Sequence, residues 1–333
     1  MHIFITGVAG FLGSNLADYY LKKGFKVSGN DNLVGGEIQN VDPKVNFYQY
    51  DSENLELNSK YFKDVDTVIH CAAYAHEGLS IFSPYLISKN IFSGSVSVFT
   101  AAVKQKVKRI VFCSSMARYG HIKQPYKESD TPIPVDPYGI AKLAAEKVLI
   151  NMSETHGIEY NIAVPHNIIG AKQKYDDPFR NVASIMINLI LQNRQPVIYG
   201  DGTQTRSFSD VDDCIFCIDK LVLEKNLKSE IFNIGPDENY ININELFKKI
   251  SNILKFNKEP FYFPERPREV KYSNCSADKA RKFLNYKTEF NIDDSLIKMV
   301  EYIKSNGPKK FIYNYDIEID NNLTPKTWTK KFF

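Results

Sequence analysis

Short apolar runs alternate with longer segments of helical periodicity through the first half of the chain. The runs are rich in strand-forming residues and apolar on both faces, which is typical of parallel strands buried on both sides. They cover residues 2–7, 26–31, 45–51, 66–73, 109–115 and 159–165. Helices are predicted between them at about 11–23, 86–105 and 137–155. Because right-handed crossovers join such units, the pattern predicts an α/β fold with a doubly wound parallel sheet.

This rhythm breaks after about residue 167. A polar, loop-like stretch precedes a helix in "VASIMINLILQ" and a strand in "PVIYGDG". Helical periodicity resumes in "SDVDDCIFCIDKLVL", and "EIFNIG" is typical of another strand. Three more helices are predicted near 242–254, 277–284 and 293–305.

Two interleaved units follow from these boundaries. The first covers residues 1–167 and about 210–237, and a smaller, mostly helical substrate-binding lobe covers 168–209 and 238–306. The aromatic-rich stretch 307–333 has no clear period, and we expect it to pack on the surface as an extended tail.

The composition excludes several classes of protein. Of 333 residues, 43% are hydrophobic and 24% are charged, which argues against disorder. The net charge is only +3 and no dense basic stripe occurs, so nucleic acid is not expected as the main partner. No apolar run approaches the roughly 18 residues that span a bilayer, and "MHIFITG" is typical of a first strand rather than a signal peptide. We expect a cytoplasmic protein with no membrane partner.

No metal site is expected. The five cysteines are scattered, and Cys214 and Cys217 form a lone Cys-x-x-Cys pair without the second pair that a metal site needs. Buried thiols in a reducing compartment are the better interpretation. His76, His121 and His166 could each touch a ligand, but none has metal-ligand spacing, and single histidines are more often structural.

A glycine-rich turn joins the first strand to the first helix. "TGVAGFLGSN" places Gly7, Gly10 and Gly13 where the backbone must turn tightly and approach a pyrophosphate closely. The helix N-terminus then offers free N–H groups to the phosphates, and Phe11 and Leu12 lie inside the same turn. The alternative is three glycines that merely pack a helix against a sheet. The strand–turn–helix context favours a dinucleotide cofactor.

Asp31 ends the second strand and is followed by Asn32. A carboxylate at that place hydrogen-bonds a ribose 2′-hydroxyl and would repel a 2′-phosphate. The sequence therefore predicts NAD rather than NADP, with both residues at the cofactor.

A tyrosine four residues before a lysine occurs three times, at Tyr19–Lys23, Tyr119–Lys123 and Tyr138–Lys142. The first tyrosine is expected in the core, and glycine and proline follow the second too closely for a stable helix. The third differs because Asp136 can cap the helix and Pro137 suits its first position.

On that helix Tyr138 and Lys142 lie one turn apart. A phenol titrates near pKa ~10, and a nearby ammonium favours the phenolate and lowers that pKa toward neutrality. We therefore predict that Tyr138 is a catalytic acid/base and that Lys142 tunes it while holding the cofactor ribose.

Several motifs together resemble the extended short-chain dehydrogenase/reductase family. They are the Gly-x-x-Gly-x-x-Gly turn, "DNL" at 31–33, "VIHCAA" at 68–73, "CSSMARYG" at 113–120 and "YGIAK" at 138–142. The resemblance covers roughly residues 1–300, and is closest to nucleotide-sugar 4-epimerases of the UDP-glucose/UDP-N-acetylglucosamine type. It implies a Rossmann domain in which Asp51 and Ser52 lie near the adenine, Ala72 and Ala73 line the phosphate and ribose, and Asn90 lies on the adjoining helix.

The resemblance also assigns the third catalytic residue and the reaction. Ser115 matches the catalytic serine, while its neighbour Ser114 is expected to be structural. Related dehydratases carry a carboxylic acid after this serine, whereas Met116 and Ala117 stand here. Epimerisation is therefore favoured over elimination.

Substrate contacts follow from the same resemblance. Arg206 and Arg266 match diphosphate-binding positions, with Arg268 a weaker candidate, and Asn167 and Asn181 match substrate-contacting positions. Lys172 stands where relatives carry an arginine, which leaves the role of that position open. Ser273 occupies a position that limits room beside C2 of the sugar, so an N-acetyl group is expected to fit.

Arg118 stands where relatives usually carry valine. It could receive the carboxylate of a uronic acid, or turn toward phosphate or solvent. The expected activity is inversion of C4 of UDP-GlcNAc/UDP-GalNAc or UDP-Glc/UDP-Gal with retained NAD, by a homodimer formed through the helices near 86–105 and 137–155. The alternatives are a UDP-uronate 4-epimerase, a sugar-nucleotide oxidoreductase that releases its cofactor, and a non-catalytic NAD-sensing regulator.

Overall fold

A seven-stranded parallel sheet forms the centre of the computed structural model, which describes residues 1–238 and 240–333. The strand order is β11-β6-β5-β4-β1-β2-β3. The bounds are β1 His2–Thr6, β2 Lys26–Asp31, β3 Asn46–Gln49, β4 Thr67–His70, β5 Arg109–Cys113, β6 Glu159–Pro165 and β11 Glu230–Ile234. All neighbours pair in parallel, so the predicted α/β fold with a doubly wound parallel sheet is confirmed.

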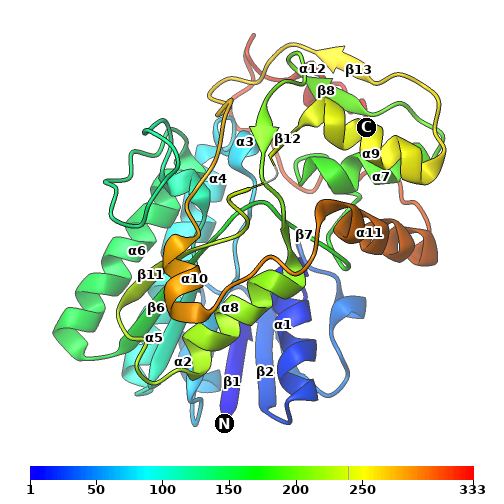
Figure 1. The fold of residues 1–333 in the computed structure, drawn as a ribbon. Coiled ribbons are helices and arrows are strands. Elements are labelled where there is room, and N and C mark those ends of the chain that lie inside the picture. Colours follow the sequence, from blue (N-terminus) through cyan, green and yellow to red (C-terminus); the bar gives the residue numbers. More distant parts are fainter. Residues whose placement is uncertain (239) are drawn as a thin grey trace.

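Helices cover both faces of this sheet (Figure 1). One hydrophobic core lies between the sheet and α1 (Phe11–Lys22), α8 (Val211–Leu223) and α10 (Asp278–Leu284). A second core lies between the opposite face and α2 (Leu55–Tyr61), α5 (Gly94–Lys104) and α6 (Pro137–His156). The expected division places α10 in the second lobe, but its Ala280 and Leu284 are buried in the first core.

The second lobe lies above the carboxyl ends of the strands (Figure 1). Its core is formed mainly by α7 (Val182–Leu191), α9 (Ile243–Leu254) and α11 (Ile292–Asn306). Short strand pairs connect its loops: β8 (Val197–Tyr199) with β13 (Phe261–Phe263), β12 (Ile241–Asn242) with β9 (Thr205–Arg206), and β10 (Ser209–Asp210) with β7 (Ile168–Ile169).

The stretch Pro84–Lys104 is a helical segment of 21 residues. It comprises α4 (Pro84–Ser88), the π-helical turn η2 (Lys89–Ser93) and α5, and by length and composition it could cross a membrane. Ser, Lys and Asn interrupt its apolar residues, so it contains no long apolar run although its mean hydropathy is high. In this fold its buried side pairs with α2 and α6 against the sheet, which is the place of a core helix.

The tail 307–333 packs over the junction between the sheet domain and the second lobe. It contributes Tyr315 and Trp328 to a cluster, called here the tail cluster, whose other buried members are Leu79, Phe82 and Phe179. Ser83 Oγ donates to the carbonyl of Asp316 at 2.6 Å, and Ile319 N donates to the carbonyl of Phe82 at 2.9 Å. The short α12 (Lys326–Thr329) places Trp328 against Phe179 of the second lobe. The tail is therefore a structural tie between the two units.

Trp328→Ala should lower stability by about 3–5 kcal/mol, because it removes a large side chain that is only 2% exposed. Leu323→Ala in the same tail is the matched control, since Leu323 is 61% exposed and should change stability by less than about 0.5 kcal/mol. Thermal unfolding of both variants measures the difference. Equal midpoints would show that the tail is not part of the cooperative structure.

Candidate active site

One cavity of about 470 Å³ lies between the carboxyl edge of the sheet and the second lobe. Every residue predicted from the sequence to bind cofactor or substrate lines it, except Ser273. The lining set is Gly7, Gly10, Phe11, Leu12, Gly13, Asp31, Asn32, Asp51, Ser52, Ala72, Ala73, Asn90, Ser115, Tyr138, Lys142, Asn167, Asn181, Arg206 and Arg266. The fold thus brings residues from both units to one space.

Ser273 lies outside this lining. Isolated bridges pair Thr205 with Tyr272 and Tyr126 with Cys275, and hold the stretch around Ser273 against neighbouring loops. The cavity lining therefore does not support the prediction that the small Ser273 leaves room for an N-acetyl group.

The glycine turn has room for backbone only. A Cβ on Gly13 would lie 2.2 Å from the carbonyl oxygen of Gly7, and Gly7 has φ +70° and lies against the backbone of Ala72. Gly10 precedes α1 and gives no side-chain cap, so the first N–H groups of the helix face the cavity without an intrahelical partner. This arrangement fits a pyrophosphate group.

Asp31 is held rigidly at the end of β2. One carboxylate oxygen accepts from Leu33 N at 2.8 Å and the other from Ala9 N at 3.1 Å. Burial raises the pKa of Asp31, and these hydrogen bonds oppose the rise. Asn32 donates to Asp51 at 2.7 Å and to Tyr74 OH at 3.0 Å, which continues the polar wall. The residues present thus fit an NAD molecule with an unphosphorylated ribose.

Tyr138 and Lys142 reach the cavity from the first turns of α6. Asp136 caps this helix by accepting from Gly139 N at 2.8 Å, and Pro137 occupies the first turn. Neither of the other two tyrosine–lysine pairs belongs to the described lining of the cavity. Tyr119 is instead fully buried, and its hydroxyl donates to Asn233.

The pKa shifts of Tyr138 and Lys142 differ from the expectation that the lysine lowers the pKa of the tyrosine. Burial raises the pKa of Tyr138 to about 12, and a hydrogen bond with Ser115 opposes the rise. Burial lowers the pKa of Lys142 to about 8. Lys142 Nζ donates to the carbonyl of Cys113 at 2.8 Å, so in this state Ser115 rather than Lys142 stabilises the phenolate.

Arg118 corrects both interpretations made from the sequence. It is 3% exposed, does not line the cavity, and its Nη2 lies 3.0 Å from Glu146 Oε2 of α6. Ser114 Oγ also donates to Glu146, which is consistent with a structural Ser114. Arg118 is therefore buried outside the cavity lining, bound to α6, and does not meet a uronate in this arrangement.

The second lobe contributes an arginine cluster. Arg266 donates to Glu269 from Nε at 3.1 Å and from Nη2 at 3.0 Å, and Arg206 Nη2 lies 3.4 Å from the same carboxylate. Arg268 also lines the cavity, whereas Lys172 instead binds Asp18 at 2.6 Å. Two fixed guanidinium groups at one wall suit a diphosphate.

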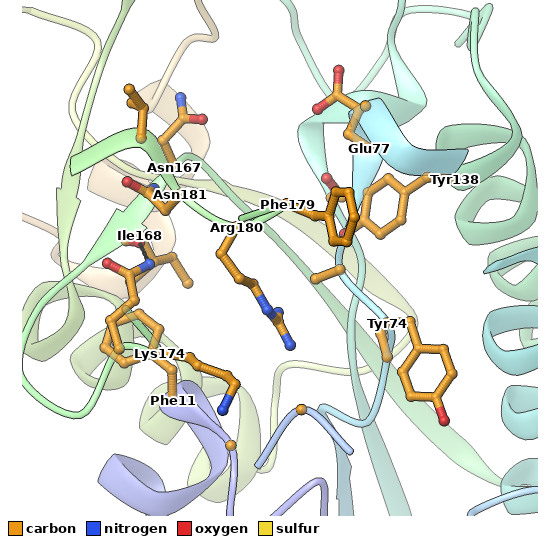
Figure 2. Close-up of a pocket in the computed structure, with 18 of the residues that line it drawn as sticks. Phe11, Tyr74, Glu77, Tyr138, Asn167, Ile168, Lys174, Phe179, Arg180 and Asn181 are labelled. Carbon is orange, nitrogen blue, oxygen red and sulfur yellow. Dashed lines mark hydrogen bonds between the residues drawn. The ribbon is translucent and has the colours of Figure 1, made fainter. Parts of the chain in front are cut away.

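Arg180 is a cavity residue that sequence reasoning missed. Figure 2 shows its side chain extended into the middle of the cavity, between Lys174 on one side and Tyr74 on the other. Its Nε lies 3.3 Å from Asp177, which also accepts from His76 Nε2 at 2.9 Å. Burial opposes the charge on Asp177, yet His76 and Arg180 lower its pKa to about 2. Arg180 lies only three positions from Asp177, but the contact of Asp177 with His76 spans 101 positions and leaves no local signal in the sequence.

The sequence matches a known protein family and resembles related proteins over most of its length. The model of the NAD dependent epimerase/dehydratase family matches residues 3–235. The chain is 33% identical over 311 residues to a putative UDP-glucose 4-epimerase of Methanocaldococcus jannaschii, covering 92% of this chain and 99% of that protein.

Two solved structures share the fold. UDP-glucose 4-epimerase of Thermotoga maritima with UDP-glucose has a TM-score of 0.87 at 30% identity, covering 92% of this chain and 99% of that one. A variant UDP-glucuronic acid 4-epimerase of Bacillus cereus, in complex with a fluorinated UDP-glucuronic acid and NAD, has a TM-score of 0.85 at 27% identity, covering 92% and 100%. The two structures are named for different sugars, glucose in the first and glucuronic acid in the second.

Gly13→Ala should reduce the NAD that copurifies to less than about a tenth of the wild-type amount, because the new Cβ would overlap the Gly7 carbonyl. Gly94→Ala is the matched control, since its nearest contacts would be 4.0 Å away in a helix. Acid extraction and chromatography of both purified proteins measure the bound dinucleotide. Full NAD content in Gly13→Ala would contradict the assigned phosphate site.

Proposed function

Because this chain belongs to the NAD dependent epimerase/dehydratase family, we propose that it inverts C4 of a UDP-hexose with NAD retained between turnovers. The observation that carries the proposal is the meeting of Ser115, Tyr138 and Lys142 at a cavity that also contains the glycine turn. A UDP-N-acetylhexosamine is the second candidate substrate of the same reaction.

Tyr138, Ser115 and Lys142 have separate roles in the proposed reaction. Tyr138 takes the proton of the C4 hydroxyl and later returns it, while Ser115 orients the same oxygen by a hydrogen bond. Bound NAD supplies the hydride acceptor and donor, and its positive charge favours the phenolate of a tyrosine whose pKa is otherwise about 12. The role that we propose for Lys142, whose Nζ here donates to the Cys113 carbonyl, is to hold the ribose of bound NAD.

Hydride return to the opposite face requires the keto sugar to turn within the cavity. The diphosphate must stay fixed during that rotation, which is the role we propose for Arg206 and Arg266. Met116 and Ala117 follow Ser115, so that position offers no acid for elimination. This favours epimerisation over dehydration.

The sugar assignment rests on what lines the cavity. Arg118 was the sequence candidate for a uronate carboxylate, and it is paired with Glu146 outside the lining. Ser273, the candidate for an N-acetyl pocket, is outside the lining as well. Neither position decides among the sugars, and UDP-glucose is the first substrate to test because relatives carry it in their names.

Proton NMR of the purified protein without added cofactor tests the reaction directly. UDP-glucose, UDP-GlcNAc and UDP-glucuronate are supplied separately, and the anomeric signal of the 4-epimer is followed. Turnover would establish retained NAD and epimerisation together. Turnover only with added NAD and with accumulation of NADH would favour an oxidoreductase instead.

Tyr138→Phe should lower kcat by about 10²- to 10⁴-fold, because the proton acceptor is removed. Binding of the UDP-sugar, measured by calorimetry, should change by no more than a few fold. Tyr119→Phe is the matched control, since that tyrosine also precedes a lysine by four positions but is buried outside the cavity. A Tyr138→Phe protein with wild-type kcat would refute the assigned acid/base.

We further propose a homodimer formed through the helices near 86–105 and 137–155, where α4, η2 and α5 lie beside α6. Exposed apolar side chains gather on this surface: Tyr85 is 70% exposed, Phe92 37% and Ile140 53%. Such a surface is costly to leave in water and is typical of subunit contacts.

Light scattering after size-exclusion chromatography should give twice the 38.1 kDa chain mass for the wild type. Phe92→Glu with Ile140→Glu should convert it to a monomer, because two charges would be desolvated at the contact. Ile297→Glu on α11 is the control, with an exposed isoleucine of the second lobe. A monomeric wild type would overturn the proposal.

A further inference from the structure

Glu77 is an acidic residue that the sequence analysis and the proposed reaction leave unexplained. It is the first residue of α3 (Glu77–Ser80), directly after the loop that follows β4. Its side chain is exposed, and Glu77 lines the cavity. Figure 2 places Glu77 next to Tyr138 on the same side of the cavity.

The carboxylate of Glu77 has no hydrogen bond or ion pair within the part of the chain that the structure describes. Arginines are near: a Cβ on the adjacent Gly78 would lie 3.2 Å from Arg266 Nη1. Arg266 nevertheless binds Glu269 with two hydrogen bonds, and Arg206 is directed to the same partner. A carboxylate left unpaired beside two cations is available to a ligand.

The charges around the cavity act on Glu77 in opposite directions. Burial raises the pKa of Glu77, the charges of Arg206 and Arg266 oppose the rise, and Glu269 adds to it. Because the side chain of Glu77 is exposed within the cavity, its charge can persist without a protein partner and remain available to a ligand.

The position of Glu77 is fixed rather than adaptable. Its neighbour His76 is fully buried and binds Asp177, and Ser80 N donates to the His76 carbonyl at 3.0 Å. On the other side, Leu79 and Phe82 are buried in the tail cluster. The tail and the second lobe together hold α3 in place.

Glu77 lies between the two groups of residues assigned to the reaction. Its charge acts on Tyr138 and Asp136 at one end and on Arg206 and Arg266 at the other. If Tyr138 meets C4 and the arginines hold the diphosphate, the sugar ring lies between them. This step rests on the proposed function.

We propose that Glu77 is a sugar-recognition residue, whose carboxylate accepts hydrogen bonds from hydroxyl or ammonium groups of the sugar and disfavours a sugar carboxylate. A charged acceptor in an enclosed site strengthens bonds from donors, and it repels a second anion for the same reason. Glu77 thereby selects neutral or amino hexoses over uronates.

Glu77→Gln is the central test because it keeps shape and removes the charge. Its kcat/KM for UDP-glucose should fall about 10- to 100-fold, the usual value of a hydrogen bond to a charged group. The ratio of kcat/KM for UDP-glucose over UDP-glucuronate should fall by at least about tenfold. Glu56→Gln, an exposed glutamate of α2 outside the cavity lining, is the control and should match the wild type.

UDP-glucosamine separates the two donor types. A larger loss for this substrate than for UDP-glucose in Glu77→Gln identifies the ammonium as the partner, and equal losses identify hydroxyl groups. The melting temperature of Glu77→Gln should not fall, since no internal contact of the carboxylate is lost. A lower melting temperature with an unchanged substrate ratio would show a structural role and overturn the proposal.

Failure of the two proposals is distinguishable. A wild-type protein that epimerises none of these sugars refutes the proposed function, and calorimetric binding of the same UDP-sugars to wild type and Glu77→Gln still tests Glu77. A wild-type protein that epimerises UDP-glucose, with Glu77→Gln retaining both its rate and its substrate ratio, refutes the role of Glu77 alone.

Discussion

The parallel direction of all seven strands is the constraint on which the site depends. Their carboxyl ends meet at one edge, and the glycine turn after β1, Asp31 of β2 and Ser115 after β5 all reach the cavity from there. Strands buried on both faces cannot slide in register without exposing their core residues. The sheet therefore sets the spacing between the glycine turn, Asp31 and Ser115, and the loops that follow the strands add the remaining side chains of the cavity.

The cavity also depends on the position of the second lobe relative to that edge of the sheet, and buried contacts between the two units fix this position. His76 of the sheet domain binds Asp177, which also pairs with Arg180, and the tail cluster joins α3 to Phe179. Burial lowers the pKa of His76, so its contact with Asp177 acts as a buried hydrogen bond, and losing the histidine would leave a desolvated carboxylate with one partner fewer. Such contacts specify the geometry of the cavity more than they stabilise the fold.

The enclosed carboxylates of the molecule show two different treatments. Glu146 is paired with Arg118 and Ser114, Asp177 with His76 and Arg180, and Glu269 with two arginines. Glu77 differs from them because its side chain is exposed, lines the cavity and has no partner among the described residues. It is the carboxylate that we propose meets the sugar.

The sequence by itself determined what depends on neighbouring residues: the alternation of strands and helices, the glycine turn, Asp31 at a strand end, and the cap that places Tyr138 and Lys142 on one helical turn. These follow from short periods and from backbone rules that act within a few positions. Only the tertiary structure decided which groups meet, such as Lys142 with the Cys113 carbonyl and Arg118 with Glu146. It also placed Arg180 and Glu77 in the cavity lining and Ser273 outside it. Finally, it packed α10 on the sheet and the tail against both units. Those choices join residues up to hundreds of positions apart, and the competition among charges for partners in an enclosed space leaves no periodic trace in the chain.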